Sequence, residues 1–123
     1  MAINKVGFLS DEIINSAGSQ LSSGDVFLSD GLKNHMINHG HSSCLPFIPR
    51  IQDIINNPDY VGKSPNESGN SIELVKVFTV ENKNIEIAIK LDSSNNYLYV
   101  STMYELQPLK LTNRLKSGRL KKL

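Results

Sequence analysis

The chain has 123 residues, a length that fits a single domain with its own hydrophobic core. Its composition is 39% hydrophobic and 20% charged with one cysteine, Cys44, which excludes an intrachain disulfide and is unlike that of disordered or fibrous proteins. No apolar run approaches the roughly 18 residues that cross a bilayer, and the N-terminus lacks the pattern of a signal peptide, so we expect no membrane partner and a cytoplasmic site of action.

The net charge of +1 hides an uneven distribution of charge. Six of the thirteen cations lie in residues 110–123, which contain no anion: Lys110, Arg114, Lys116, Arg119, Lys121 and Lys122. The other 109 residues carry seven cations and twelve anions. A basic segment on an acidic body is typical of a phosphate-contact surface, and the alternative is a solvated tail.

The first half of the chain predicts helices. Residues 1–28 form a lead-in, with a short strand at 4–9, a short helix that Ser10 caps and a short extended segment at 26–28. Residues 29–57 contain two further helices. Ser29 caps the first, which Gly40 can end, and the second spans residues 50–57.

The second half predicts a sheet. Residues 57–70 form a long loop, and β-branched strands then follow at 71–80, 85–91 and 96–104, joined by short turns that favour antiparallel pairing. Pro108 opens a final helix over residues 109–117, and Gly118 ends it. We therefore expect one α+β domain over residues 1–123, in which the helices pack on one face of an antiparallel sheet.

Three histidines lie within seven residues, and two of them, His35 and His39, have the i, i+4 spacing of one helix face. Imidazoles titrate near ~6.5, which suits general acid–base catalysis. The alternative is one buried structural histidine with exposed neighbours. A zinc site of His35, His39, His41 and Cys44 is a further alternative, but its ligands crowd around one helix end, so we expect no metal or other cofactor.

The third strand carries hydroxyl groups at Ser101, Thr102 and Tyr104, which could contact a phosphate or a base. Strict alternation would place Tyr97, Tyr99, Ser101 and Met103 on one face, and Leu98, Val100, Thr102 and Tyr104 on the other. The alternative is that these residues only have high strand propensity.

In the final helix, Arg114 is the best-placed cation, with Lys110 four residues before it on the same face and Arg119 just beyond the helix end. The planar guanidinium suits phosphate contact and stabilisation of a phosphorane.

Six segments, taken in order, resemble the phage-type branch of the barnase–EndoU–colicin–RelE-like ribonucleases. They are residues 31–39, 54–62, 71–76, 87–92, 97–104 and 114–121. The resemblance implies N-terminal helices followed by a sheet of about four antiparallel strands, with the active site on the sheet. It also implies a toxin domain that cleaves RNA without a metal. The family's polar signature positions match His35, His39, Lys76, Lys90, Ser101, Tyr104, Arg114, Ser117 and Arg119.

The sequence therefore predicts a metal-independent endoribonuclease, with tRNA as one candidate substrate, that uses the RNA 2′-hydroxyl as nucleophile. We expect His39 as the leading acid or base and His35 as the second, with Tyr104 or Ser101 positioning the reacting groups. Cations stabilise the phosphate, and the expected substrate contacts are Arg114, Arg119, Lys76, Lys90, Thr102, Lys110 and Ser117.

The expected partners are RNA and an immunity protein or antitoxin, and the domain could be delivered as part of a phage or secreted toxin. A non-catalytic nucleic-acid-binding or regulatory phage module is the main alternative, and a structural phage protein is the third.

Overall fold

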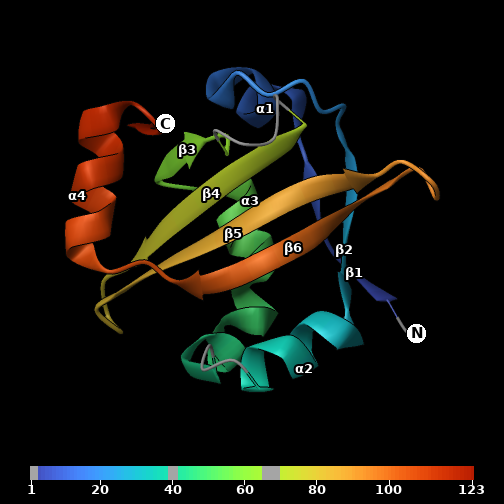
Figure 1. The fold of residues 1–123 in the computed structure, drawn as a ribbon, viewed down its shortest axis with the longest axis horizontal. Coiled ribbons are helices and arrows are strands. Elements are labelled where there is room, and N and C mark those ends of the chain that lie inside the picture. Colours follow the sequence, from blue (N-terminus) through green and yellow to red (C-terminus); the bar gives the residue numbers. More distant parts are fainter. Residues whose placement is uncertain (1–2, 39–41, 65–69) are drawn as a thin grey trace.

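The computed structural model describes residues 3–38, 42–64 and 70–123 (Figure 1). In chain order the elements are β1 (Ile3–Leu9), α1 (Asp11–Ala17), β2 (Gly24–Ser29), α2 (Asp30–Asn38), the 3₁₀ helix η1 (Ser42–Arg50), α3 (Ile51–Asn56), β3 (Tyr60–Gly62), β4 (Ser71–Phe78), β5 (Lys83–Asp92), β6 (Tyr97–Glu105), α4 (Pro108–Ser117) and β7 (Leu120–Lys122). The α+β class is confirmed.

Within the described ranges, seven strands form one sheet in the order β1-β2-β6-β5-β4-β3-β7. Strands β2 and β6 pair in parallel, and every other neighbouring pair is antiparallel, so the sheet is mixed. The expectation of about four antiparallel strands is therefore only partly right. Strands β4, β5 and β6 correspond to the three strands predicted in the second half of the chain, and they lie side by side in the sheet.

Strand β1 confirms the predicted strand at 4–9, and β2 includes the extended segment predicted at 26–28. Strands β3 and β7 lie in segments with other predictions, the loop 57–70 and the basic C-terminal segment. Strands β3 and β7 each have three residues, which is too short to show a period-two pattern. Strand β3 pairs with β4 and β7, and among the described strands the only partner of β7 is β3, about 60 residues earlier in the chain, so local signals could not reveal β7.

One face of the sheet, here called the helix face, carries the main hydrophobic core. Helices α1, α2 and α3 and the 3₁₀ helix η1 all contribute buried side chains to this core. Figure 1 shows α3 passing behind β4, β5 and β6. The predicted helix at 50–57 corresponds to α3 at Ile51–Asn56, which buries Ile51, Ile54 and Ile55 and follows directly on η1.

The other helix predictions hold where the structure describes them. The hydroxyl of Ser10 accepts a hydrogen bond from the Ile13 amide at the start of α1, and that of Ser29 accepts one from Leu32 in α2. The predicted end of α2 at Gly40 lies outside the described residues. Within the described part of the chain, no helix is long and apolar enough to span a bilayer.

The opposite face, here called the α4 face, is covered by α4 at one end only. A second, smaller cluster lies here, in which Val75, Leu106 and Leu120 are buried and Leu111 of α4 packs against them. No residue of α4, which the structure describes in full, is itself buried. Apolar contacts by themselves would therefore hold α4 only weakly on the sheet.

A β-bulge in β6 decides which side chains share the α4 face. Ile89 pairs with Val100 and Ala88 pairs with Thr102, so Ser101 is an additional residue in β6. The strict alternation expected along this strand is therefore wrong, because the extra residue shifts its phase. Tyr97 and Tyr99 lie on the same face as Thr102 and Tyr104. Leu98, Val100 and Met103 are buried in the core on the helix face.

Candidate functional site

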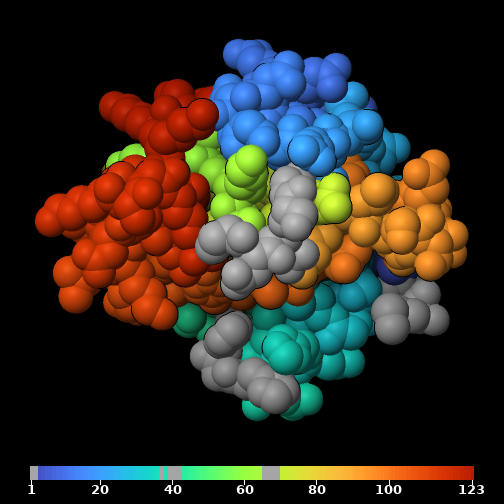
Figure 2. Space-filling view, turned by 45° about the horizontal axis from the view of Figure 1, so that its top comes forward, coloured from blue at the N-terminus to red at the C-terminus, as the bar shows by residue number. Residues whose placement is uncertain are grey.

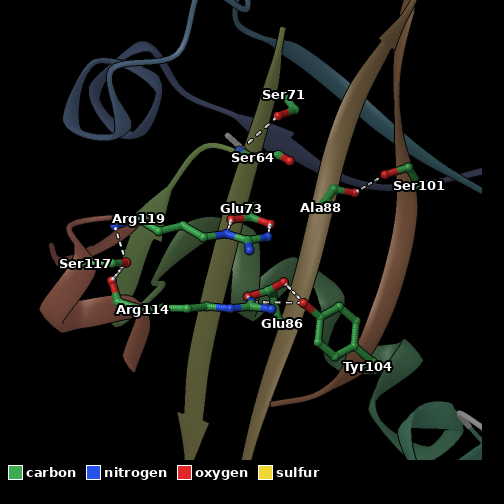
Figure 3. Close-up of polar contacts among 10 residues, drawn as sticks. All are labelled: Ser64, Ser71, Glu73, Glu86, Ala88, Ser101, Tyr104, Arg114, Ser117 and Arg119. Atoms are coloured by element: carbon green, nitrogen blue, oxygen red, sulfur yellow. Dashed lines mark hydrogen bonds and ion pairs between the residues drawn. The ribbon is translucent and has the colours of Figure 1, made fainter. Parts of the chain in front are cut away.

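Charged and hydroxyl side chains from different elements meet on the α4 face beside α4 (Figure 3). Glu73 lies on β4, Glu86 on β5 and Tyr104 on β6, while Arg114 lies on α4 and Arg119 in the turn before β7. Glu86 and Tyr104 are cross-strand partners, and Glu73 is one pair further along the sheet, opposite Ala88. We call these five residues the carboxylate–arginine cluster.

Glu86 is the most buried member of the cluster, with its side chain 1% exposed. The Tyr104 hydroxyl donates a hydrogen bond to Oε2 of Glu86, and Nη1 of Arg114 donates one to Oε1. The same Nη1 atom lies 2.9 Å from the Tyr104 hydroxyl oxygen. The three groups therefore form a closed triangle in which a proton can pass between the tyrosine and the carboxylate.

Glu73 forms a bidentate ion pair with Arg119. Nε of Arg119 lies 2.8 Å from Oε1, and Nη2 lies 2.7 Å from Oε2. The Glu73 side chain is 4% exposed, whereas that of Arg119 is 30% exposed. The pairing leaves the Nη1 donors of this fork for another partner, so Arg119 is the cation of the cluster that is most accessible to a phosphate.

The turn between α4 and β7 positions both arginines. The Ser117 hydroxyl donates to the carbonyl of Arg114 and accepts from the amide of Arg119. Gly118 ends α4 with a φ of 84°, a left-handed conformation that favours glycine. On the adjoining strand, a Cβ added at Gly62 would collide with the carbonyl oxygen of Arg119, so this approach also requires glycine.

Burial and charge shift the proton affinities within the cluster. Burial, together with the negative charge of Glu73, raises the pKa of Glu86 above its ordinary value, although the hydrogen bonds from Tyr104 and Arg114 act in the opposite direction. Burial and the charge of Glu86 raise the pKa of Tyr104 to about 12. Glu86 is thereby a stronger base than an exposed glutamate, and Tyr104 keeps its proton at neutral pH.

A hollow of about 550 Å³ adjoins the outer side of Arg119. Lys63 and Lys121 line it together with Arg119, and α1 contributes Ala17. Figure 2 shows α1 (blue) and the C-terminal segment (red) meeting at the surface. Further cations lie exposed nearby in sequence, and we call the exposed set Lys110, Lys116, Lys121 and Lys122 the C-terminal lysines. This end of the molecule can therefore attract an anionic ligand.

The structure brings together four of the residues selected from the sequence: Tyr104, Arg114, Ser117 and Arg119. Two more share the α4 face. The Ser101 hydroxyl is occupied by the carbonyl of Ala88, at 3.2 Å, and Thr102 is exposed.

The predicted lysine contacts are dispersed. Lys90 is on the α4 face, opposite Tyr99. Lys76 lies on the helix face, where its Nζ donates to the carbonyl of Asn57 at 2.9 Å. Lys110 is exposed on α4.

The histidines do not join this cluster where the structure describes them. His35 is exposed on α2, a helix that packs through Met36 into the core of the helix face. His39 and His41 lie outside the described residues. Cys44, the fourth residue of the zinc alternative, is buried in η1, and burial raises the pKa of its thiol. The described residues contain no group of three potential metal ligands.

Sequence reasoning did not select Glu73 and Glu86. Each stands as a single carboxylate between apolar residues of a predicted strand, which is the signal that could have identified them. Isolated charges are rarely buried unless they are paired, and the only surplus of cations in the sequence lies in residues 110–123. The sequence alone therefore allows the prediction that these strand glutamates pair with the C-terminal arginines.

The chain is similar to a known protein family. Neither the curated proteins nor the solved structures contain a significant match to the chain. The family described as phage-Barnase-EndoU-ColicinE5/D-RelE like nuclease3 matches residues 4–113, which include Glu73, Glu86 and Tyr104. The match covers most of the sequence, and the chain belongs to this phage nuclease family.

Proposed function

We propose that the chain is a metal-independent endoribonuclease whose active centre is the carboxylate–arginine cluster. One observation carries the proposal: a buried glutamate of raised pKa is hydrogen-bonded to a tyrosine hydroxyl and flanked by two arginines on the α4 face. RNA supplies its own nucleophile, the 2′-hydroxyl. Its cleavage then requires a base, an acid and positive charge, and the cluster contains all three.

In the proposed reaction, a phosphate draws Arg114 away from Oε1 of Glu86, which opens that oxygen to the 2′-hydroxyl. Glu86 takes the 2′-proton while the 2′-oxygen forms a bond to phosphorus and the bond to the 5′-oxygen breaks. Tyr104 gives its phenolic proton to the departing 5′-oxygen, and Glu86 returns a proton to Tyr104 through their hydrogen bond. The products are a 2′,3′-cyclic phosphate and a 5′-hydroxyl, and the protons balance.

Arg114 and Arg119 stabilise the charge that develops on the phosphorane. Arg119 suits this role because its side chain is 30% exposed and its Nη1 donors point away from the pairing with Glu73. The cationic hollow beside it, with Lys63 and Lys121, provides a path for the next phosphate of the strand.

This proposal gives the acid–base role to Glu86 and Tyr104 rather than to His35 and His39. His35 lies on the opposite layer of the molecule from the cluster. The acid–base role of His39 stays a prediction from the sequence, and the cleavage rates of histidine variants test it. His35→Ala and His39→Ala should each cleave RNA at the wild-type rate. A large loss in His39→Ala would return the acid–base role to histidine.

The test is cleavage of single-stranded RNA in excess EDTA. The wild type should cleave, and Glu86→Gln and Tyr104→Phe should each be slower by about 10²- to 10⁴-fold, the usual contribution of a general acid or base. Asn113→Ala, which removes an exposed, uncharged side chain of α4, is the matched control and should retain full activity.

A non-catalytic nucleic-acid-binding module is the second candidate, and one observation favours it. Both glutamates are already fully paired with arginines, an arrangement that would also serve only to hold α4 on the sheet. This candidate predicts RNA binding without cleavage in the same assay.

We propose further that the activity is that of a toxin acting on RNA in the cytoplasm, and that an immunity protein or antitoxin neutralises it. Induced expression in a bacterial host should arrest growth, and Glu86→Gln should not. Growth arrest of equal strength by both proteins would contradict a toxic effect through RNA cleavage.

A further inference from the structure

The turn of the β5–β6 hairpin lies at the end of the sheet away from α4 (Figure 1). A group of aromatic side chains lies near this turn on the α4 face. Phe27 of β2 contacts Tyr97 of β6, with ring centroids 5.6 Å apart and an angle of 85° between the ring planes. Tyr97 also contacts Tyr99, at 6.3 Å and 65°. All three rings are partly exposed, and we call them the aromatic platform.

The bulge at Ser101 places the platform and the carboxylate–arginine cluster on one continuous surface. Tyr99 is opposite Lys90 in β5, and Lys90 is four residues along that strand from Glu86. Four residues of a strand span roughly 13 Å, so the platform begins on the same face, a short distance beyond the proposed acid and base. An RNA strand bound with its cleaved phosphate at Glu86 could place one of its nearby bases over these rings.

A surface hollow lies on each side of the aromatic platform. Phe27 and Tyr97 line a hollow of about 570 Å³ on one side and share a second, of about 290 Å³, with Tyr99 on the other. The larger one lies within the range of roughly 300–1,000 Å³ typical of small-molecule sites. Because Phe27 and Tyr97 stand nearly perpendicular, a flat ring laid on either one meets the edge of the other. This corner fits one planar group.

The charge of the platform differs from that of the cluster. Asp25 lines the larger hollow and Asp92 the smaller one. Asp92 is held in place as the acceptor for the backbone amides of Ser94 and Asn95 in the β5–β6 turn. Asp25 is paired with Lys5 at 3.0 Å, so Asp92 is the carboxylate that disfavours a phosphate group here, whereas an uncharged base carries no such cost.

We infer that the aromatic platform is a base-binding subsite that stacks one unpaired base of the RNA substrate, on the same strand as the scissile phosphate. The inference rests on the proposed function, because it assigns the cleaved phosphate to the carboxylate–arginine cluster. It restricts the substrate to single-stranded or unpaired RNA, since a paired base in a duplex cannot reach the rings. Stacking on a ring is tolerant of sequence, so the subsite selects unpaired structure rather than one base.

The experiment uses 2′-O-methyl oligonucleotides, which lack the nucleophile and cannot be cleaved. A series carries the fluorescent base 2-aminopurine at successive positions, and the full chain is titrated against each member. We expect fluorescence quenching at one position. Tyr97→Leu should abolish that quenching and raise the Kd by about 5- to 150-fold, the equivalent of the ~1–3 kcal/mol that one stacked base contributes. Tyr97→Phe, which keeps the ring, should bind as the wild type does.

Two controls separate stacking from loss of structure. Phe8→Leu changes an aromatic residue of β1 that is 50% exposed and does not belong to the platform, and it should leave the Kd unchanged. An abasic residue at the quenched position should weaken binding of the wild type by the same factor as Tyr97→Leu. The abasic oligonucleotide tests the inference with the wild-type protein, so it gives a result even where Tyr97→Leu does not fold. Unchanged binding and quenching in Tyr97→Leu, or no effect of the abasic residue, would overturn the inference.

The outcomes distinguish this inference from the proposed function. Glu86→Gln should lose cleavage and keep the quenching. Quenching that depends on Tyr97 in a wild type that cleaves no RNA supports the platform and contradicts the ribonuclease. Cleavage with an unchanged KM in Tyr97→Leu supports the ribonuclease and contradicts the platform.

Discussion

Replacement of Arg114 by alanine tests whether the cluster is held together as the structure indicates. The change leaves the carboxylate of Glu86, which is 1% exposed, without the cation that neutralises it. Removal of one partner from a buried ion pair costs about 3–5 kcal/mol, and we expect the lower end because the Arg114 side chain is 15% exposed. A protein of this length has a stability of roughly 6–18 kcal/mol, so the loss is a substantial fraction of the total.

Urea unfolding measures this loss. With a slope of about 1–3 kcal/mol per molar urea, a loss of ~3 kcal/mol lowers the midpoint by roughly 1–3 M. Lys116→Ala removes an exposed cation from the same helix and should change stability by less than about 0.5 kcal/mol. The double variant Glu86→Gln/Arg114→Ala should be more stable than Arg114→Ala, because the buried negative charge is also gone.

The pH dependence follows from the raised pKa of Glu86. A carboxyl group whose pKa is higher in the folded protein holds its proton more tightly there, so stability falls as pH rises from the ordinary value of 4.5 to the raised one. Arg114→Ala removes two interactions that lower this pKa, which extends the window upward. The variant should therefore lose more stability at pH 7 than near pH 4.5. An equal loss at both pH values, or a loss below about 1 kcal/mol at pH 7, would refute the reasoning.

Three further predictions concern activity and binding. Gly62→Ala should unfold at lower urea and cleave more slowly, because the new Cβ displaces the backbone of Arg119. Gly24→Ala should do neither, because its new Cβ would lie 3.9 Å from the Leu98 side chain, an ordinary van der Waals contact. The rate of cleavage should rise with pH through the raised pKa of Glu86 and show no decline near neutrality, since the pKa of Tyr104 is about 12; a falling limb near ~6.5 would indicate a histidine acid instead. Neutralising two of the C-terminal lysines should reduce the slope of log Kd against log salt by about 1.4, and an unchanged slope would place RNA elsewhere.

The extent to which the sequence predicts this fold depends on the range of each signal. Periodicity and capping identified the central strands and most of the helices, because these patterns repeat within a few residues. The parallel pairing of β2 with β6 joins segments about 70 residues apart, and nothing local encodes it. The bulge at Ser101 has no distinctive residue of its own, and its effect on the faces of β6 follows only from the register.

The candidate site was predicted in part for a similar reason. Tyr104, Arg114, Ser117 and Arg119 were found because their residue types and the basic C-terminal segment have a direct chemical interpretation. The glutamates were missed because a single carboxylate in an apolar strand has meaning only when its partner is known. The resemblance to the nuclease family, now confirmed over residues 4–113, identified the class of chemistry.

The dependence of the cluster on the turn after α4 has a consequence for biosynthesis. A ribosome makes Glu73, Glu86 and Tyr104 before Arg114, and Arg119 leaves the exit tunnel last of the five. Until then Glu73 has no counterion, and β3 has no β7 to pair with. Completion of the carboxylate–arginine cluster therefore waits for a segment that the ribosome makes after all the strands that carry Glu73, Glu86 and Tyr104.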